Sequence, residues 1–243
     1  MSEIERTIGE PRHGATERPS WRRARELVLL FCHRLLAEHL VAYTAGNISM
    51  RIDDDPDLVA VTPASLAYDT MRADDIVIIA TDGRIVHGAR RPTSELPLHT
   101  LAYLQRPDVC GVVHTHSPAA MAMAAMGRDL PPILHGIVSS CGGGVAAAPY
   151  ARGGTAEVAQ VTADALRNRS ACLLRNHGVL AIGPTVEHAY NAASVVEGAC
   201  DAYLRAAVFG PVPELPPDEV ERIRRTQWEP AWTRRTGERS HGG

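Results

Sequence analysis

The chain has 243 residues, of which 45% are hydrophobic and 22% charged, and its formal charge is −3. These values are ordinary for a globular protein and lack the basic excess of a nucleic-acid-binding protein, so we expect no nucleic-acid partner. The length allows one large domain or two small ones. The five cysteines are scattered and none forms a C-x-x-C pair, which favours a reducing, cytoplasmic location.

Both ends of the chain are predicted to be polar tails. Residues 1–20 contain no apolar core that would serve as a signal peptide. No segment approaches the roughly 18 apolar residues of a membrane-spanning helix, so we expect no membrane association. Residues 228–243 are predicted to be disordered. No linker or repeat divides residues 21–210, which predicts one mixed domain over 21–227, with a central sheet between flanking helices.

The first half of this domain is expected to alternate helix and strand. Apolar residues recur at helical spacing between Trp21 and Leu40, which predicts an amphipathic first helix. After "TAGNISMR", three short runs bounded by turn signals are predicted strands: "LVAVT", "DIVIIAT" and "RIVHG". "TSELPLHTLAYLQ" predicts a helix that is capped by Thr93 or Ser94 and carries Glu95 in its first turn.

The second half shows the same alternation. "VCGVVHTH" is a predicted strand, and "SPAAMAMAAMG" a helix begun by Ser117 with Pro118 at its first position. Three glycines at 142–144 break the chain. "GTAEVAQVTADALRN" predicts a helix, "SACLLRNHGVLAIG" two strands around a turn, and "TVEHAYNAASVVEGACDAYLRAAVF" a long helix. A short helix is expected near "PPDEVERIRR".

Two histidines at the end of one predicted strand are candidate metal ligands. Side chains alternate between the faces of a strand, so His114 and His116 point the same way. Two imidazoles on one face can reach one cation, which is a common way to begin a zinc site. On spacing alone, the alternative is two histidines that merely share a face.

Further candidates lie elsewhere in the chain. His177 also ends an apolar strand and would complete three imidazoles with an open position for substrate, although it would equally serve to close a hairpin. Glu95 is the candidate acid or base, and its alternative role is to favour the helix dipole. The glycine-rich "AGNIS" offers backbone N–H groups suited to an anion.

Taken in order, several motifs between about Leu27 and Phe209 resemble the class II aldolase/adducin family. They are "TAGNISMR", "VTPASLAYD", "RPTSELPLHTLAYLQRPDVCGVVHTHS", "GGGVAAAPYARGGT" and "ACLLRNHGVLAIG". The resemblance implies a single α/β domain whose central, mostly antiparallel sheet is covered by helices on both faces. It also implies a homotetramer with active sites at subunit boundaries.

The resemblance also assigns roles to individual residues. His114, His116 and His177 match metal-binding positions, usually for zinc, with manganese and cobalt as alternatives because imidazole suits several ions. Glu95 matches the catalytic glutamate, which also ligates the metal before substrate arrives. The positions that match substrate and phosphate contacts are Gly46, Asn47, Ala64, Ser65, Thr93 and Ser94.

The chain departs from the aldolases of this family at three places. Thr62-Pro63-Ala64-Ser65 stands where the phosphate loop usually reads T-P-[ST]-G, which weakens the inference of phosphate binding. His135 falls where the family has a tyrosine that handles the aldehyde-side hydroxyl, and a histidine is able to transfer that proton. Arg152-Gly153 stands where the aldolase has an aromatic residue.

The resemblance therefore predicts a divalent-metal-dependent lyase. It would cleave a ketose 1-phosphate, or a close analogue, to dihydroxyacetone phosphate and an aldehyde through a metal-bound enediolate, with Glu95 moving the proton. The alternative within enzymes is a decarboxylase of the same family acting on a sugar acid or hydroxy acid, in which Arg152 would pair with a carboxylate. A non-catalytic, adducin-like assembly module is the third reading, and the presence of all four candidate ligands argues against it.

Overall fold

The structure, a computed structural model, describes residues 17–233. Eight strands form one sheet in the order β4-β3-β2-β1-β5-β8-β7-β6. Their bounds are β1 Asn47–Arg51, β2 Leu58–Val61, β3 Val77–Ala80, β4 Ile85–His87, β5 Gly111–Thr115, β6 Ala146–Ala148, β7 Ala171–Leu174 and β8 Gly178–Gly183. Every neighbouring pair is antiparallel except β6 and β7. The predicted mostly antiparallel sheet is confirmed.

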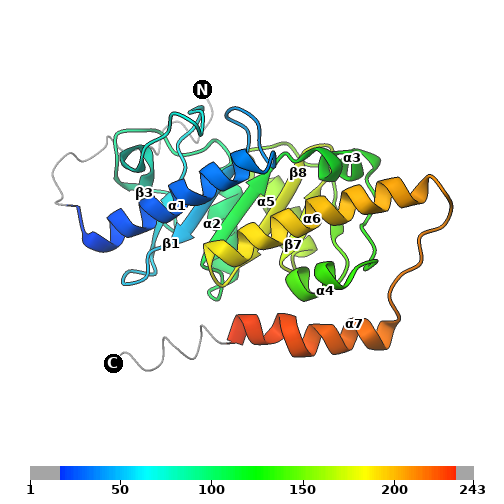
Figure 1. Cartoon of the computed structure of the whole chain (residues 1–243). Coiled ribbons are helices and arrows are strands. Elements are labelled where there is room, and N and C mark those ends of the chain that lie inside the picture. The colour runs from blue at the N-terminus through cyan, green and yellow to red at the C-terminus, as the bar shows by residue number, and fades with distance from the viewer. Residues whose placement is uncertain (1–16, 234–243) are drawn as a thin grey trace.

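Helices cover both faces of this sheet (Figure 1). The helices are α1 Pro19–Ala37, α2 Leu96–Gln105, α3 Pro118–Met126, α4 His135–Cys141, α5 Ala156–Ala165, α6 Val186–Ala207 and α7 Pro217–Ile223, with the one-turn η2 Ala73–Asp75. Two hydrophobic clusters separate the faces: α1, α3, α4 and α6 pack on one, and α2 and α5 on the other. The α/β fold class predicted from the sequence is confirmed.

Alternation along β5 shows how the strand serves both layers. Val113 belongs to the cluster beneath α1 and α6, whereas Val112 belongs to the cluster beneath α2 and α5. His114 therefore points to the same face as Val112, toward α2. The alternation of faces along β5 therefore places His114 beneath α2, the helix that begins next to Glu95.

The start of α2 differs from the prediction. The helix begins at Leu96, and Glu95 is its N-cap residue without a side-chain capping bond. Thr93 Oγ1 instead accepts a hydrogen bond from the Glu95 backbone N–H at 3.2 Å. Because the Glu95 carboxylate takes no part in capping, it is available to the residues at the end of the sheet.

The C-terminal end corrects the predicted boundary at residue 227. The helix that begins as α7 passes through a π-helical segment, η3 Arg224–Trp228, and stays helical to Thr233. Trp228 and Trp232 are buried in the cluster beneath α2 and α5, and Trp228 Nε1 donates to Ser170 Oγ at 2.7 Å. A disordered tail from residue 228 is therefore wrong for 228–233, because two tryptophans four residues apart share one helical face. The rest of that segment, 234–243, and residues 1–16 lie outside the described residues.

Within residues 17–233, no helix combines the length and apolar character that a membrane span requires. The five cysteines are all buried free thiols.

Candidate metal centre and adjoining cavity

Three histidines meet at one end of the sheet, where β5 ends and β8 begins. His114 is the fourth residue of β5, and His116 follows the strand directly. His177 closes the turn between β7 and β8, and its neighbour Gly178 is essential to that approach. A Cβ at Gly178 would lie 2.3 Å from the Thr115 carbonyl oxygen. Only glycine therefore lets this turn lie against the end of β5.

The Glu95 carboxylate completes the group. His114 Nε2 lies 2.8 Å from His116 Nε2 and 3.1 Å from Glu95 Oε2. His177 Nε2 lies 3.0 Å from Glu95 Oε1. One ligand atom from each of the four residues falls within 4.8 Å of the others. The structure thus brings together all four residues that were predicted to hold a metal.

Hydrogen bonds fix which ring nitrogen of His114 faces the group. His114 is fully buried, and its Nδ1 lies 2.7 Å from the Val179 carbonyl oxygen. Since a carbonyl only accepts, Nδ1 must carry the proton, which leaves the Nε2 lone pair directed at the other ligands in the neutral ring. A second hydrogen bond of this kind is the usual support of a metal-binding histidine.

The electrostatics favour a negative Glu95 carboxylate and a neutral His116 ring. Burial alone would raise the pKa of Glu95, but the charge of His114 and the hydrogen bonds from His114 and His177 hold it well below its usual range. Burial, together with the charges of His114 and His177, lowers the pKa of His116 from 6.5 to about 4. Ligands must be deprotonated to bind a cation, so these shifts prepare the group for one.

The donor set fits a divalent metal ion. Three imidazole nitrogens and one carboxylate are typical ligands of zinc, at bond lengths of about 2.0 to 2.2 Å. Two ligand atoms in a tetrahedral site of that size lie about 3.3 Å apart. Three of the observed separations, 2.8, 3.0 and 3.1 Å, are close to this value, and the other ligand atoms lie within 4.8 Å of one another.

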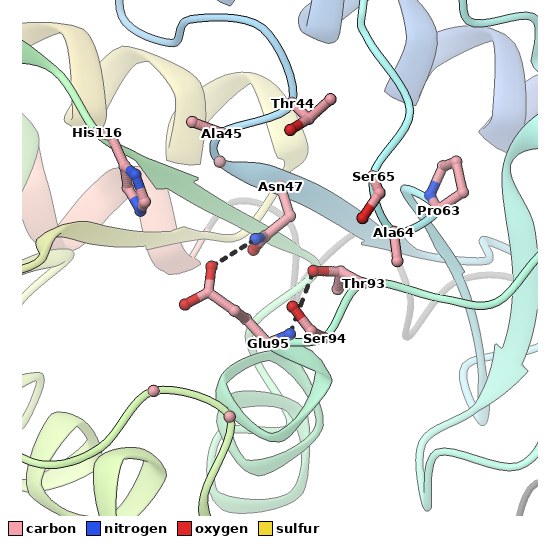
Figure 2. A pocket seen from close by; sticks show the side chains of 13 residues that line it. Thr44, Ala45, Asn47, Pro63, Ala64, Ser65, Thr93, Ser94, Glu95 and His116 are labelled. Atoms are coloured by element: carbon pink, nitrogen blue, oxygen red, sulfur yellow. Dashed lines mark hydrogen bonds between the residues drawn. The ribbon is translucent and has the colours of Figure 1, made fainter.

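A cavity of about 350 Å³ adjoins the group and contains every residue predicted to contact a substrate phosphate (Figure 2). Those residues are Gly46, Asn47, Ala64, Ser65, Thr93 and Ser94. Glu95 and His116 line the same cavity, so its polar wall is continuous with the candidate metal ligands. Thr44, Gly153 and Gly154 also line it and were not singled out as contacts in the sequence.

Two backbone turns shape this cavity. Gly46 has φ +79°, and a Cβ there would lie 2.7 Å from the His114 carbonyl oxygen. Ser65 has φ +56°, an unusual conformation for a residue other than glycine. Both residues line the cavity, as do the hydroxyl-bearing residues Thr44, Thr93 and Ser94.

His135 and Arg152 are not part of this arrangement. His135 is exposed at the start of α4, and its Nε2 lies 3.0 Å from Gln227 Oε1 on the C-terminal helix. Arg152 is exposed as well, and neither residue lines the cavity within this chain. The catalytic role of His135 stays a prediction.

The structure adds one polar residue that sequence reasoning missed, the buried His99. Asn47 Nδ2 donates to Glu95 Oε2 at 2.8 Å, and the far side of the Asn47 amide contacts the buried His99 (Figure 2 shows the first of these bonds). The available signal was helical spacing, because Glu95 and His99 are four residues apart and so share one face of α2.

Comparisons with known proteins agree with this geometry. Residues 26–204 match the family model of the class II aldolase and adducin N-terminal domain. A 5-deoxy-D-ribulose 1-phosphate aldolase from Bacillus thuringiensis is 33% identical over 199 residues, which cover 82% of this chain and 92% of the relative. A 5-methylthioribulose-1-phosphate/5-deoxyribulose-1-phosphate aldolase from Rhodospirillum rubrum is 37% identical over 180 residues, covering 74% of this chain and 80% of the relative. Among solved structures, an L-fuculose 1-phosphate aldolase superposes with a TM-score of 0.80 at 31% identity, covering 84% of this chain and 95% of that one.

The chain therefore belongs to the class II aldolase/adducin family. The expected enzyme class, a lyase that cleaves carbon–carbon bonds, is confirmed by the same matches.

Proposed function

We propose that this lyase is a sugar-phosphate aldolase that cleaves a ketose 1-phosphate to dihydroxyacetone phosphate and an aldehyde. The observation that carries the proposal is the continuity of two features. The cavity lined by hydroxyl-bearing residues and glycines is also lined by Glu95 and His116. A substrate anchored by its phosphate in the cavity would extend its carbonyl and hydroxyl groups toward the histidines.

The cavity would bind phosphate through neutral donors. No lysine or arginine is among its lining residues, whereas Thr44, Ser65, Thr93 and Ser94 supply hydroxyl groups. Successive backbone N–H groups in glycine-containing turns form anion-binding concavities, and Gly46 lies in such a turn. In the "TPAS" loop, Ala64 lacks the hydroxyl that the family motif has at this position, but Ser65 brings a hydroxyl where the motif has glycine. Because Ser65 lines the cavity, one hydroxyl of the loop remains there to bind phosphate.

Glu95 would move the proton. In cleavage, the C4 hydroxyl loses its proton and becomes the aldehyde, and the electron pair of the C3–C4 bond stays on C3 as an enediolate. A proton added to C3 then completes dihydroxyacetone phosphate. Glu95 lies at the junction of the cavity and the histidines, so its carboxylate is placed to remove this proton in aldol formation and, once protonated, to return it to C3 in cleavage. A bound divalent ion would stabilise the negative charge that develops on the substrate oxygens.

The remaining parts of the proposal concern the ion, the assembly and the aldehyde side. Three imidazoles and a carboxylate favour zinc, with manganese and cobalt as alternatives. We propose a cytoplasmic homotetramer. Because His135 lies outside the cavity of its own chain, it would take the C4 hydroxyl proton only if a neighbouring subunit supplied it.

The names of the relatives suggest which aldehydes to test. Two relatives are named as aldolases of 5-deoxyribulose 1-phosphate, and four others, 36% identical to this chain, as L-fuculose phosphate aldolases. Breaking the C3–C4 bond of these sugars releases acetaldehyde and lactaldehyde, respectively. The second relative is also named for 5-methylthioribulose 1-phosphate, which would release methylthioacetaldehyde.

The test is aldol formation with these three aldehydes. The metal-loaded protein is incubated with dihydroxyacetone phosphate and each aldehyde, and the ketose 1-phosphate is measured by mass spectrometry. We expect product with at least one aldehyde and none after chelation of the metal. No product across the panel, together with carbon dioxide release from a sugar acid or hydroxy acid, would replace the aldolase with the decarboxylase.

A further inference from the structure

Strand β1 carries a polar face that is buried. Asn47, Ser49 and Arg51 alternate with Ile48 and Met50, a pattern that usually marks one face toward solvent. In the structure the three polar residues are only 3%, 0% and 7% exposed. They lie on the face of β1 that α2 covers, and a row of polar side chains beneath a helix requires partners.

Those partners come from one face of α2 and form a continuous chain of hydrogen bonds. Tyr103 OH lies 2.8 Å from Ser49 Oγ, which lies 2.6 Å from His99 Nδ1. His99 Nε2 lies 2.5 Å from Asn47 Oδ1. The Asn47 amide reaches Glu95 Oε2 through its Nδ2 at 2.8 Å. Glu95, His99 and Tyr103 are spaced at i, i+4 and i+8, so one helix face supplies the two ends and the centre of the chain.

The donors and acceptors in this chain can run in only one direction when His99 is neutral. Asn47 Oδ1 only accepts, so His99 Nε2 must carry the proton and His99 Nδ1 must accept from the Ser49 hydroxyl. The Ser49 oxygen is then free to accept from the Tyr103 hydroxyl. Burial, and the nearby charge of His114, lower the pKa of His99 from 6.5 to about 3, which keeps the ring neutral.

Arg51 holds the far end of the chain. Its Nη2 donates to the Tyr103 carbonyl oxygen at 2.9 Å, and its Nε donates to the Val109 carbonyl oxygen at 3.0 Å. Its guanidinium also lies 4.8 Å from the centre of the Tyr103 ring. The tyrosine is therefore fixed by a cation that does not itself enter the chain of side-chain hydrogen bonds.

We propose that His99 is a positioning residue: it fixes the Asn47 amide with its nitrogen toward Glu95 and so holds the Glu95 carboxylate in place for proton transfer. The two ends of an asparagine amide have nearly the same shape, so only hydrogen-bond partners decide which end points where. If the amide were reversed, Asn47 Oδ1 would face Glu95 Oε2, and two acceptors would oppose each other. This inference rests on the proposed aldolase function.

The first test measures proton transfer without any aldehyde. Metal-loaded protein is incubated with dihydroxyacetone phosphate in D₂O, and exchange at its hydroxymethyl carbon is followed by NMR. Loss of such a supporting residue typically costs roughly 10- to 100-fold, and we expect His99→Phe to lower kcat for exchange by that factor while leaving KM nearly unchanged. His99→Gln keeps an N–H donor near the Nε2 position and should restore most of the rate.

A double-mutant cycle with Asn47→Ala tests whether His99 acts through the amide. If it does, the double variant Asn47→Ala/His99→Phe should exchange about as fast as Asn47→Ala alone, because the amide that His99 orients is gone. If the rate losses of the two single substitutions instead multiplied in the double variant, or if His99→Gln exchanged as slowly as His99→Phe, the proposal would be overturned.

Tyr103→Phe has a matched control in Tyr190→Phe. Both substitutions remove one hydroxyl from a buried ring, but the Tyr190 hydroxyl pairs with Glu38. We expect slower exchange for Tyr103→Phe and an unchanged rate for Tyr190→Phe. Equal rates for the two variants would overturn the one-way chain.

A second measurement needs no activity. Long-range ¹H–¹⁵N NMR of the metal-free protein, with the His99 signals assigned by their loss in His99→Gln, reports which ring nitrogen carries the proton. We expect protonated Nε2 and bare Nδ1, and the opposite tautomer would overturn the proposal. If the wild-type protein exchanged no hydroxymethyl proton of dihydroxyacetone phosphate, whichever divalent ion was added, the proposed function would be refuted. The tautomer of His99 would still decide the positioning role on its own.

Discussion

Asn47 and His114 face each other as partners on the neighbouring strands β1 and β5. Both side chains reach the same atom, Glu95 Oε2, at 2.8 Å from Asn47 Nδ2 and 3.1 Å from His114 Nε2. One carboxylate oxygen thus joins two strands of the sheet to the beginning of α2. Because the strand register sets this meeting point, the geometry of the site depends on the sheet rather than on a surface loop.

Removing a histidine of the cluster should remove the metal. We expect about one divalent ion per chain in the wild-type protein, measured by elemental analysis after dialysis. His114→Ala and the half-exposed His116→Ala should each bind the ion far more weakly, because an open three-histidine site loses a ligand. His33→Ala, on the exposed side of α1, is the control and should keep its full metal content. Stoichiometric metal in both cluster variants would show that the ion binds elsewhere.

Glu95→Gln should stop the chemistry and keep the metal. Glutamine has the same shape but cannot take a proton, and loss of a general acid–base group typically costs about 10²- to 10⁴-fold in rate. The metal should stay bound because three imidazoles remain to hold it. Retro-aldol turnover and metal content are therefore measured on the same preparation. The exposed Glu157→Gln in the first turn of α5 serves as the control. Full turnover by Glu95→Gln would transfer the proton-moving role to another residue.

The metal-free protein should lose stability as the pH falls, and His99 should account for part of the loss. The folded state holds the pKa of His99 at about 3, below its ordinary 6.5, so between these values the unfolded chain binds more protons. Stability from this residue is complete above about pH 6.5 and declines as the pH falls toward 3. At pH 5 the loss is on the order of 2 kcal/mol.

Urea unfolding at pH 7 and pH 5 measures this effect. His99→Gln has no imidazole to protonate, so its unfolding free energy should change less between the two pH values than that of the wild type. An equal change in both proteins would show that His99 is protonated in the folded state.

Two glycine-to-alanine substitutions should act in opposite directions. Gly46 has φ +79°, and a Cβ there would meet the His114 carbonyl oxygen and Val41 Cγ1 at 2.7 Å each, so Gly46→Ala should destabilise by about 1 to 3 kcal/mol. Gly198 lies within α6 with nothing near its would-be Cβ, and Gly198→Ala should stabilise by about 0.5 to 1 kcal/mol. Thermal unfolding distinguishes the two. A Gly46→Ala variant as stable as the wild type would mean that the turn adjusts freely.

Trp228→Ala should destabilise the whole domain. Trp228 is 7% exposed, packs in the cluster beneath α2 and α5, and bonds Ser170. Truncating a buried tryptophan typically costs about 3 to 5 kcal/mol. Arg225→Ala, on the exposed side of the same helix, should stay within about 0.5 kcal/mol of the wild type in chemical denaturation. Comparable stability of the two variants would mean that the C-terminal helix does not contribute to the core.

The sequence predicted the parts of this fold that follow from local periodicity. The alternation of "VCGVVHTH" placed His114 and His116 on one face, and Ser117 with Pro118 marked the start of α3, as observed. Bringing Glu95 and His177 to that pair required the resemblance to a known family, because no local pattern relates positions that are far apart in the chain.

Other features were beyond local reasoning for physical reasons. The alternating polar residues of β1 lie beneath α2, and only tertiary packing reveals that Ser49 and His99 meet. Trp228 fell within the predicted disordered tail, yet its four-residue spacing to Trp232 gives one apolar face that packs in the core. In both cases the partner surface lay far away in sequence.

The strand order has a consequence for how the site moves. β1, β5 and β8 lie at the centre of the sheet, with other strands on both sides. Amide protons in such central strands exchange with solvent mainly when the entire domain unfolds, whereas loops open at much smaller free-energy cost. His114, which lies on β5, is therefore expected to keep its place for as long as the domain stays folded, and His116 and His177 lie directly beside the ends of β5 and β8. The Ser65 and Gly153 segments that line the cavity lie outside the strands, so we expect them to open at a smaller free-energy cost and to admit substrate without disturbing the metal ligands.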